Sequence, residues 1–377
     1  MKAAFSRFLG ADPNRLHAAA HSHHPWPDVT YAAHMRAWED AARLMDDKWD
    51  HVFGTVVPSA RRRVAAVLGL DDPDTLVFAP NTHEFVVRIA STLPQPFRVL
   101  TSDSEFHSFS RQAARWEEDG VVVDRVPAEP FGTFPERFMA AHDGHDLVFM
   151  SHVHFNSGYV LADLEGVVKT LEGSQVVIDG YHGFMAVPSD LSAVADRAYY
   201  LAGGYKYAMA GEGACFLHVP PSAPQRPANT GWWAGFGALT EKREDVPYGP
   251  GGQRFAGATA DPSGIYRLDS VLGWLEEEGP GVAERHRTVT ELQDQLLGAL
   301  PEELTEQLVV DAASRPRGPI LAFERPDAEA IYSRLHRRGV VTDYRGDRWR
   351  VGLGIYHDEA DVELLADAVV EATEEHT

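Results

Sequence analysis

The sequence predicts an α/β protein, with a large domain on a mostly parallel sheet and a smaller α+β domain at the C-terminal end. Three observations support this prediction. Between residues 76 and 219, short apolar runs alternate with segments of helical periodicity, which is typical of the βα units of a parallel sheet. After residue 264 the predicted strands become shorter and the regular alternation stops. Finally, 377 residues are more than one typical domain needs, so the chain can bury two cores.

We therefore expect an N-terminal segment over residues 1–30, a large domain over residues 31–264 and a small domain over residues 265–377. The N-terminal segment contains four histidines between positions 17 and 24, followed by two prolines that bar a helix. No acidic or cysteine ligand is interleaved with these histidines at the spacing of a tetrahedral site. We interpret them as pocket-lining or surface residues and predict no metal site.

The large domain is expected to begin with two helices, over residues 31–49 and 59–70. In the first, four apolar residues at helical spacing form a face that we expect to pack in the core: Trp38, Ala42, Met45 and Trp49. In the second, the arginines at positions 61–63 are expected on the solvated face. Strands are then expected over residues 76–79, 98–101, 121–126 and 147–153, with helices between them starting near residues 84, 108 and 134.

The remaining elements surround a long irregular stretch. Residues 220–264 are rich in turn residues, and we interpret them as a connection that passes over the active site. Helices are expected from residue 265 and over residues 282–300, strands over residues 308–311, 320–324, 340–344 and 349–353, and a last helix from residue 359.

Charge and composition disfavour several classes of partner. The 56 acidic residues exceed the 34 basic ones, giving a net charge of -22, which disfavours nucleic acid and anionic membranes. No apolar run approaches the roughly 18 to 20 residues of a membrane span. The N-terminus does not read as a signal peptide, so we expect a cytoplasmic protein. The one cysteine, Cys215, excludes an intramolecular disulfide and is expected to be a core thiol.

Residues 174–219 suggest the chemistry. An apolar strand delivers Asp179 at its C-terminal end, a loop carries His182, and a second strand leads to Lys206 among glycines. This arrangement suggests pyridoxal phosphate, because a lysine can form the covalent link to its aldehyde while a buried carboxylate keeps the pyridine nitrogen protonated. Ligands of parallel sheets bind at the C-terminal strand ends, where the polar loops of this chain are expected to gather.

The motifs IDGYHG and GGYKYAMAGEGACFL resemble the aminotransferase class V branch of the fold-type I pyridoxal phosphate enzymes, and the Tyr-Lys-Tyr with its glycine turn is most similar to kynureninase. The stretches HVHFNSG, GWWAGFG, QRFAGAT and WRVGLGIYHDEADV agree in order. The resemblance implies a seven-stranded type of sheet in the large domain. It also implies that Lys206 is the cofactor-linked lysine, that Asp179 pairs with the pyridinium, and that His182 lies against the ring oxygen or Asp179.

The same resemblance assigns further residues to the cofactor. Phe106 matches the residue that stacks on the ring, with plain core packing as the alternative. The phosphate is expected at the mouth of the helix near residue 84, where Thr82 and His83 precede it, and Tyr205 aligns with a phosphate ligand. Trp232 and Thr259 align with other phosphate-site residues. In the family the threonine comes from the neighbouring subunit, which implies a homodimer.

Arg350 matches the arginine that binds the substrate carboxylate through its planar fork. Kynureninases read Asn-Phe-Pro-Thr-Asp where this chain has Glu-Phe-His-Ser-Phe at residues 105–109, so Phe109 replaces an aspartate near the ring. His107 and Ser108 are then candidates for the substrate pocket. The histidine-rich N-terminal segment also differs from kynureninases, which makes His21 a further candidate.

The resemblance implies a homodimeric lyase or hydrolase that takes an L-amino acid and breaks a C–C or C–S bond at Cβ. Cysteine desulfurases carry a nucleophilic cysteine in the small domain, and residues 337–350 contain none, so persulfide formation on the protein is not expected. Transamination, or decarboxylation or oxidative deamination of a cysteine conjugate, is an alternative on the same site. A catalytically degenerate regulator that binds the cofactor is a third.

Overall fold

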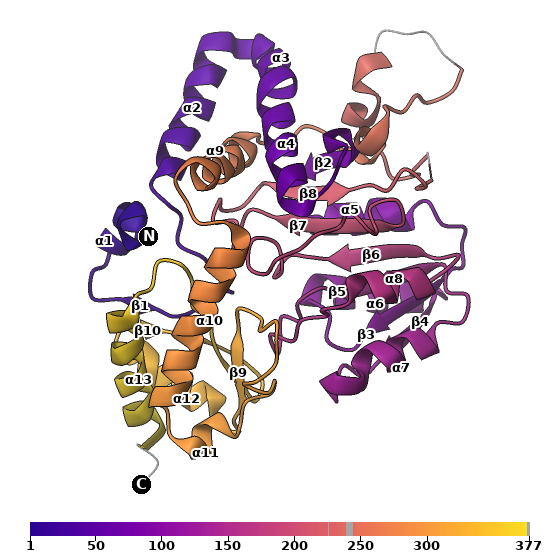
Figure 1. The fold of residues 1–377 in the computed structure, drawn as a ribbon. Coiled ribbons are helices and arrows are strands. Elements are labelled where there is room, and N and C mark those ends of the chain that lie inside the picture. Colours follow the sequence, from indigo (N-terminus) through magenta and orange to yellow (C-terminus); the bar gives the residue numbers. More distant parts are fainter. Residues whose placement is uncertain (225, 239–243, 375–377) are drawn as a thin grey trace.

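The computed structural model describes residues 1–224, 226–238 and 244–374. Its centre is a seven-stranded sheet with the order β2-β8-β7-β6-β5-β3-β4 (Figure 1). The strands are β2 (Leu76–Ala79), β3 (Arg98–Ser102), β4 (Val122–Val126), β5 (Leu147–Ser151), β6 (Gln175–Asp179), β7 (Ala198–Gly203) and β8 (Cys215–His218). Strand β8 runs antiparallel to both of its neighbours, and every other pair is parallel. The predicted mostly parallel sheet is confirmed.

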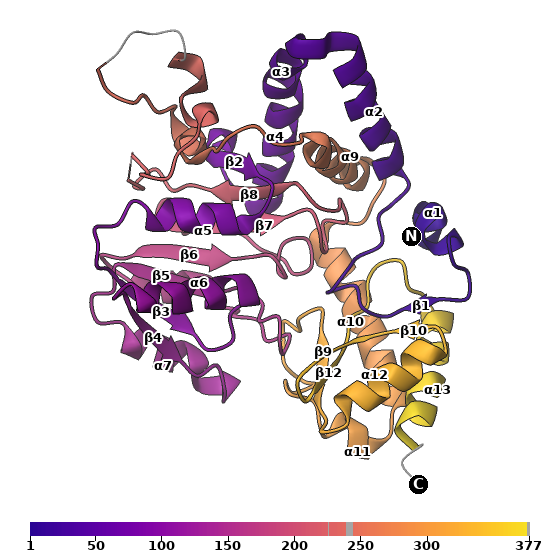
Figure 2. The ribbon, with the colours of Figure 1, turned by 180° about the vertical axis from the view of Figure 1, so that it is seen from behind.

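Helices cover both faces of this sheet. The helices of the large domain are α2 (Val29–Leu44), α3 (Lys48–His51), α4 (Val57–Leu68), α5 (Thr82–Ala90), α6 (His107–Glu118), α7 (Phe134–Ala141), α8 (Leu164–Thr170) and α9 (Ser263–Glu277). Helices α5 and α6 lie over one face of the sheet (Figure 2), with which they share one apolar cluster. Helices α4, α7, α8 and α9 share a second cluster with the other face. Both faces of the central strands are therefore closed to water, whereas the edge strand β4 stays largely exposed.

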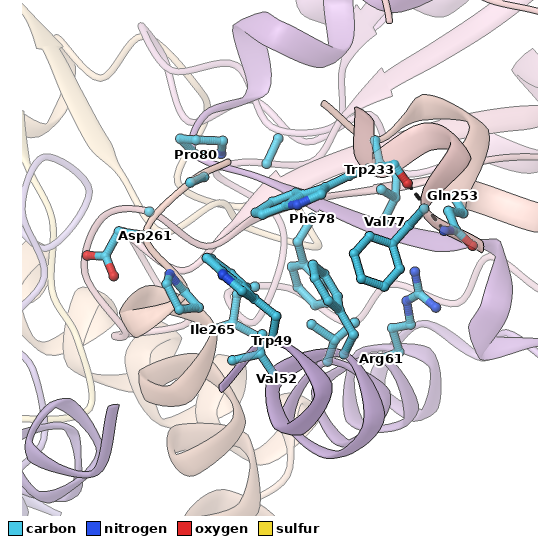
Figure 3. A pocket seen from close by; sticks show the side chains of 18 of the residues that line it. Trp49, Val52, Arg61, Val77, Phe78, Pro80, Trp233, Gln253, Asp261 and Ile265 are labelled. Carbon is cyan, nitrogen blue, oxygen red and sulfur yellow. Dashed lines mark hydrogen bonds between the residues drawn. The ribbon is translucent and has the colours of Figure 1, made fainter. Parts of the chain in front are cut away.

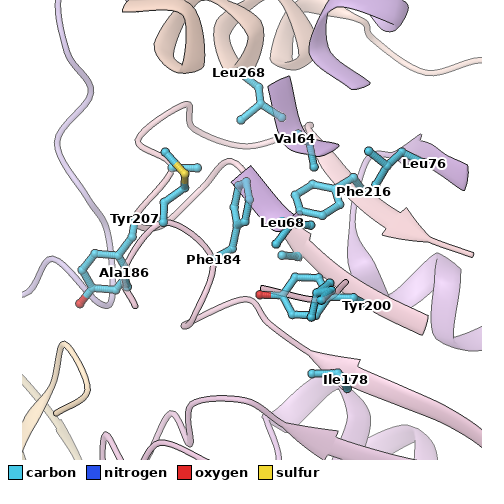
Figure 4. Packing of buried hydrophobic residues seen from close by; sticks show 14 of the residues in the cluster. Val64, Leu68, Leu76, Ile178, Phe184, Ala186, Tyr200, Tyr207, Phe216 and Leu268 are labelled. Atoms are coloured by element: carbon cyan, nitrogen blue, oxygen red, sulfur yellow. The ribbon is translucent and has the colours of Figure 1, made fainter. Parts of the chain in front are cut away.

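The alternation of side chains along β7 explains why its sequence is continuously apolar. Tyr199 belongs to the cluster with α5, whereas Tyr200 belongs to the cluster with α4 and α9, and both are fully buried. Figure 4 shows Tyr200 of β7 and Phe216 of β8 packed against Val64 and Leu68 of α4. Burying residues on both faces makes β7 the rigid support of the segment that follows it.

Two expectations about the first helices were wrong. Trp38 and Met45 are 66% and 69% exposed, so the predicted aromatic stripe is not in the core. Helix α2 instead packs on α9 with small residues such as Ala33, and it ends before Met45, where the backbone turns with φ at +51°. A helical stripe cannot continue through that turn to Trp49. The arginines at positions 61–63 are not all solvated either, because two of them are half-buried and pair with acidic residues.

The small domain holds a three-stranded antiparallel sheet with the order β11-β12-β9. Its elements are α10 (Val282–Ala299), α11 (Glu302–Thr305), β9 (Leu321–Glu324), α12 (Ala328–Arg337), β10 (Val340–Val341), β11 (Asp343–Arg345), β12 (Arg348–Val351) and α13 (Glu359–Glu374). The strand expected over residues 308–311 is wrong. Leu308 makes only an isolated bridge to Phe323 before a turn that begins at Asp311.

The N-terminal segment joins the small domain. After α1 (Ser6–Gly10), strand β1 (Leu16–His17) pairs in parallel with β10, and Ala19 bridges to Gly352. In its described part, the segment expected as a long connection contains two short 3-10 stretches, η6 (Trp232–Ala238) and η7 (Gly251–Phe255), before α9 begins at Ser263. The three-part domain division stays a prediction. None of the helices in the described ranges has the length and apolar character needed to cross a bilayer.

Candidate active site

The site is built on the ends of two neighbouring parallel strands. Asp179 is the last residue of β6, and it pairs in register with Leu201 near the end of β7. Three residues after β7 ends at Gly203 comes Lys206, whose side chain is buried. Because parallel strands end at one edge of the sheet, the acid and the lysine are brought to the same edge. This part of the predicted arrangement is what the structure shows.

The amine of Lys206 lies in an environment that favours its neutral form. Burial lowers the pKa of Lys206 to about 7, despite the opposing charge of Asp179. A hydrogen bond joins Lys206 Nζ to His182 Nε2. The pKa of His182 is well below its ordinary value, because the ring is buried and lies beside the lysine. With a pKa of about 7, a large fraction of Lys206 is the neutral amine at neutral pH, and the neutral amine is the form that attacks an aldehyde.

The pKa of Asp179 changes in the opposite direction to that of Lys206, because burial disfavours its negative charge. The backbone N–H of Tyr181 donates to Asp179 Oδ1 at 2.9 Å, yet the pKa of Asp179 is raised by burial to about 6. A buried carboxylate of this kind is stabilised by a cation placed beside it. A protonated pyridine nitrogen is such a cation.

A second buried acid, Glu105, was missed from the sequence. Its carboxylate accepts hydrogen bonds from Ser102 Oγ at 2.7 Å and Ser151 Oγ at 2.5 Å. Burial, with a further contribution from the charge of Asp179, raises the pKa of Glu105 to about 7. In the sequence Glu105 follows Ser-Asp-Ser and looks like a surface residue. The local sequence pattern does not indicate that Glu105 lies between the ends of two strands, β3 and β5.

Helix α5 begins at the same edge of the sheet, because β2 runs parallel to β7 across the intervening β8. Its N-cap is Asn81, whose side chain accepts from the N–H of Glu84 at 3.1 Å. We had expected Thr82 and His83 to precede the helix. They are instead its first two residues. Their backbone N–H groups belong to the end of the helix that favours an anion.

Aromatic side chains form one wall of the site. Lys206 Nζ lies 5.4 Å from the ring centroid of Phe106, and Phe106 is 40% exposed, so it does not serve as core packing. Its ring meets Phe155 edge to face at 5.5 Å, and His107 meets Phe155 in the same way at 5.2 Å. Phe109 points elsewhere: it stacks on Phe149 inside the core. Phe109, which stands where kynureninases carry an aspartate near the ring, is thus a core residue in this chain.

The small domain contributes a buried arginine. Arg350 Nη1 donates to the carbonyl oxygen of Phe155 at 2.5 Å, and its Nη2 pairs with Asp343. His21 from the N-terminal segment is fully buried beside them, with Nε2 3.5 Å from Asp343 Oδ2. Burial lowers the pKa of His21 to about 4, so its imidazole is neutral at neutral pH. The charges of Arg350 and Lys206 also act on His21, so the three groups share one site.

Four predicted residues lie at the margin of this site. Tyr205 is half-buried and its ring meets His23 edge to face at 5.4 Å. Ser108 is exposed and lines a groove with His83 on the surface of α5 and α6. Trp232 Nε1 donates to Thr259 Oγ1 at 3.1 Å, and both residues are exposed. The structure does not bring this last pair to Lys206 within one chain.

A separate apolar cavity of about 310 Å³ lies between α3, β2, η6 and the start of α9 (Figure 3). The rings of Trp49 and Trp233 meet across it at 5.6 Å, and Gln253 Nε2 donates to the carbonyl oxygen of Trp233 at 3.2 Å. Its lining also includes Ala260 and Asp261, which follow Thr259. The cavity therefore borders the loop that carries Thr259.

The described ranges contain no group of three or more histidine, cysteine, aspartate or glutamate side chains arranged to hold a metal ion. The histidines of the N-terminal segment are instead engaged separately, as with His24, whose Nδ1 contacts the carbonyl oxygen of Pro25 at 2.7 Å.

The family model described as aminotransferase class V matches residues 41–365. The chain belongs to this family. As a class V protein with the observed residues at its strand ends, it is an enzyme that uses pyridoxal 5'-phosphate, and the predicted cofactor is confirmed. The residues fit the group, since Lys206 presents a buried amine whose pKa is lowered to about 7, Asp179 a buried carboxyl group whose pKa is raised to about 6, and α5 a helix N-terminus at the same edge of the sheet.

Relatives of this class V enzyme differ in their activities. This chain is 25% identical in sequence to isopenicillin N epimerase of Streptomyces clavuligerus over 82% of its own length and 83% of that protein. It is 23% identical to a probable cysteine desulfurase of Vibrio cholerae over 84% and 82%. The match to kynureninase of Burkholderia mallei is 28% but covers only 55% and 51%. The resemblance to kynureninase is thus partial.

Solved structures confirm the fold. The complex of the cystine C–S lyase C-DES with its reaction product cysteine persulfide superposes with a TM-score of 0.82, at 19% identity, over 97% of this chain and 99% of that one. This likeness establishes the fold-type I architecture of the class V enzyme, with its large sheet and small C-terminal domain.

Proposed function

We propose that this class V enzyme is a lyase that breaks the bond between Cβ and sulfur in an L-amino acid. The observation that supports the proposal is the buried Lys206, which is hydrogen-bonded to His182, has a pKa lowered to about 7 and feels the charges of both Asp179 and Arg350. Such a lysine is suited to take a proton from Cα of an amino acid whose carboxylate is fixed by an arginine. The bound cofactor supplies an electron sink for the charge that develops at Cα.

Each residue has a distinct task in this proposal. Asp179 keeps the pyridine nitrogen protonated, because its own buried charge is stabilised by that cation. Arg350 binds the α-carboxylate with its planar fork and orients the substrate above the wall formed by Phe106. Lys206 removes the Cα proton, and His182 holds the amine in place. The sulfur leaves with the bonding electron pair, and one water completes the conversion to pyruvate, ammonia and a thiol.

We favour sulfur over carbon as the leaving atom because two similar proteins act on C–S bonds. They are described as a probable cysteine desulfurase and a cystine C–S lyase. The route through a protein persulfide is disfavoured by the cysteine inventory. Cys215 is buried in β8, and burial raises the pKa of its thiol to about 12. A thiol of this kind is not a nucleophile at neutral pH. The sulfur is therefore expected to leave as a small molecule.

The kynureninase-like reaction, hydrolysis of a C–C bond at Cβ, is the second candidate, because the kynureninase match includes part of the chain. It is distinguished by its products. L-Kynurenine cleaved at this bond yields alanine, whereas the proposed lyase reaction yields pyruvate and ammonia.

The test is a substrate panel with the purified holoenzyme. S-substituted L-cysteines, L-cystine and L-kynurenine are incubated separately, and pyruvate, ammonia, alanine, carbon dioxide and inverted amino acid are measured. We expect pyruvate and ammonia in equal amounts from the sulfur compounds, and none with Lys206→Ala. Alanine from kynurenine alone, or transamination, decarboxylation or inversion without sulfur release, would overturn the proposal. Absence of every product would indicate a regulator that only binds the cofactor.

We also propose a homodimer in which Thr259 acts at the phosphate of the neighbouring subunit. The exposed Trp232–Thr259 pair borders the apolar cavity, which continues past Asp261 to a second hollow lined by the exposed Trp38. An apolar cavity rimmed by exposed tryptophans is a surface that a partner chain can cover. A second copy of the chain is the occupant that would bring Thr259 to a cofactor site.

Mixed dimers test this arrangement. Lys206→Ala and Thr259→Ala subunits are unfolded and refolded together, and activity is compared with that of each variant alone. If Thr259 acts in the neighbouring subunit, one site of each hybrid dimer has both native residues and activity rises above that of either parent. No gain in hybrids whose formation is confirmed by mass spectrometry would contradict the shared site.

A further inference from the structure

One face of the β11–β12 hairpin carries four charged side chains. In this antiparallel pair Asp343 lies opposite Arg350, and Arg345 lies opposite Arg348. Residues directly opposite each other, and residues two apart on one strand, point to the same face of the sheet. The one residue between Arg348 and Arg350 confirms the alternation, because Trp349 is fully buried in the small-domain core. The charged face is therefore turned away from that core.

This charged face is turned toward the large domain. Arg350 bonds to the carbonyl oxygen of Phe155, and Arg348 pairs with Glu129, which follows β4. Arg345 donates from Nη1 to Asp343 Oδ1 at 2.7 Å. Asp343 thus holds two arginines at once.

The two arginines bound to Asp343 differ in exposure. Only 3% of the Arg350 side chain is exposed, whereas 47% of Arg345 is. Arg350 is therefore deep in the site and Arg345 is at its mouth. The positive charge of Arg345 contributes, after that of Arg350, to the lowered pKa of Lys206. Arg345 is thus electrostatically part of the site, although its guanidinium remains open to solvent.

The spacing along the hairpin sets the distance between Arg345 and Arg350. Arg345 is two residues beyond the position opposite Arg350, which corresponds to about 7 Å along a strand. Arg348 is already paired with Glu129 of the large domain, so the remaining charges of the face are Arg345 and Arg350 against the single Asp343. A positive excess at a site mouth attracts anions, and it does so here in a chain whose net charge is -22.

We propose that Arg345 is a second anion-binding residue, and that the substrate is an L-amino acid whose sulfur-linked group ends in a carboxylate. Arg350 takes the α-carboxylate and Arg345 takes the distal one. Asp343 orients both guanidinium groups. This inference rests on the proposed function, since it specifies the leaving group that the lyase accepts.

The test compares two substrates that differ by one charge, S-(2-carboxyethyl)-L-cysteine and S-propyl-L-cysteine. The holoenzyme is assayed for kcat/KM with each, and binding is followed independently through the change in cofactor absorbance. We expect the carboxyethyl compound to be preferred about tenfold, as for one charge-assisted hydrogen bond, with the preference falling at high salt. Arg345→Gln should lose this preference, chiefly through weaker action on the carboxyethyl compound.

Arg348→Gln is the matched control, because it removes the same charge from the same face but from a residue paired with Glu129. We expect this variant to keep the preference. If Arg345→Gln lowers kcat/KM equally for both compounds, Arg345 only holds Asp343 and the proposal is wrong. Equal kcat/KM for both compounds in the native enzyme contradicts it too. If the native enzyme cleaves neither compound but yields other products from the panel, the lyase assignment fails first, and the inference falls with it.

Discussion

Replacing Glu105 by glutamine should change how the stability of the protein depends on pH. The carboxyl group is enclosed by Ser102 and Ser151, and its pKa is raised from 4.5 to about 7, mainly by burial. A raised pKa of an acid means that the folded state favours the neutral form. The corresponding stability is present below the ordinary pKa and is lost as the pH rises through about 7.

The magnitude follows from that pKa. One pKa unit corresponds to about 1.36 kcal/mol, so ionising Glu105 in the folded protein costs about 3 kcal/mol, of which about 2.5 kcal/mol develops between pH 5 and pH 8. Glutamine has nearly the same shape and does not titrate. The free energy of unfolding of Glu105→Gln, relative to the native protein, should therefore rise by about 2 to 3 kcal/mol over this range.

Urea unfolding at pH 5, 6, 7 and 8 measures this difference, using conditions where fluorescence and circular dichroism give the same transition. Glu117→Gln is the control. Glu117 is exposed and paired with Arg125, which lowers its pKa, so its contribution should not change between pH 5 and pH 8. A flat difference for Glu105→Gln across the range would refute the reasoning, because it would mean that Glu105 is ionised throughout.

Three further predictions follow from individual contacts. Arg350→Lys replaces a fork by a point charge and should lower kcat/KM by roughly 10- to 150-fold, measured with the best substrate of the panel. Asp179→Asn keeps an acceptor for the N–H of Tyr181 and should fold, yet retain cofactor roughly 10- to 150-fold less tightly in dialysis. Gly211→Ala should lower the free energy of unfolding, measured in urea, by about 2 to 4 kcal/mol, because φ is +70° and the new Cβ would lie 2.2 Å from Trp26. Gly213→Ala is its control: φ is +88° but the space around the new Cβ is open, so the loss should be only about 1 to 2 kcal/mol.

The parts of the fold that could be predicted are those set by local sequence. Apolar runs between helical segments identified the parallel sheet, and the polar residue at the end of such a run identified Asp179. Lys206 followed from the next strand. Helix α2 could not be read in the same way, because its apolar residues Trp38 and Met45 face outward while small residues make the contact with α9. Periodicity identifies a stripe but does not say which face the fold covers.

The parts of the site that were missed depend on contacts between distant segments. Glu105 is hydrogen-bonded to Ser102 and Ser151, which end two different strands of the sheet, β3 and β5. The association of Asp343 with Arg350 is fixed by the register of a hairpin, and a slip of one residue would separate them. Phe109 shares its sequence neighbourhood with Phe106 but points into the core, since α6 begins between them.

The central claim is that Lys206 carries the cofactor. The chain contains five lysines, so reduction of the holoenzyme with borohydride followed by peptide mass spectrometry can distinguish them. The account predicts that the peptide containing Lys206 gains the mass of the reduced cofactor and that the other four lysines remain unmodified. Cofactor mass on a different lysine, or on none in a protein that retains the cofactor, would contradict the account.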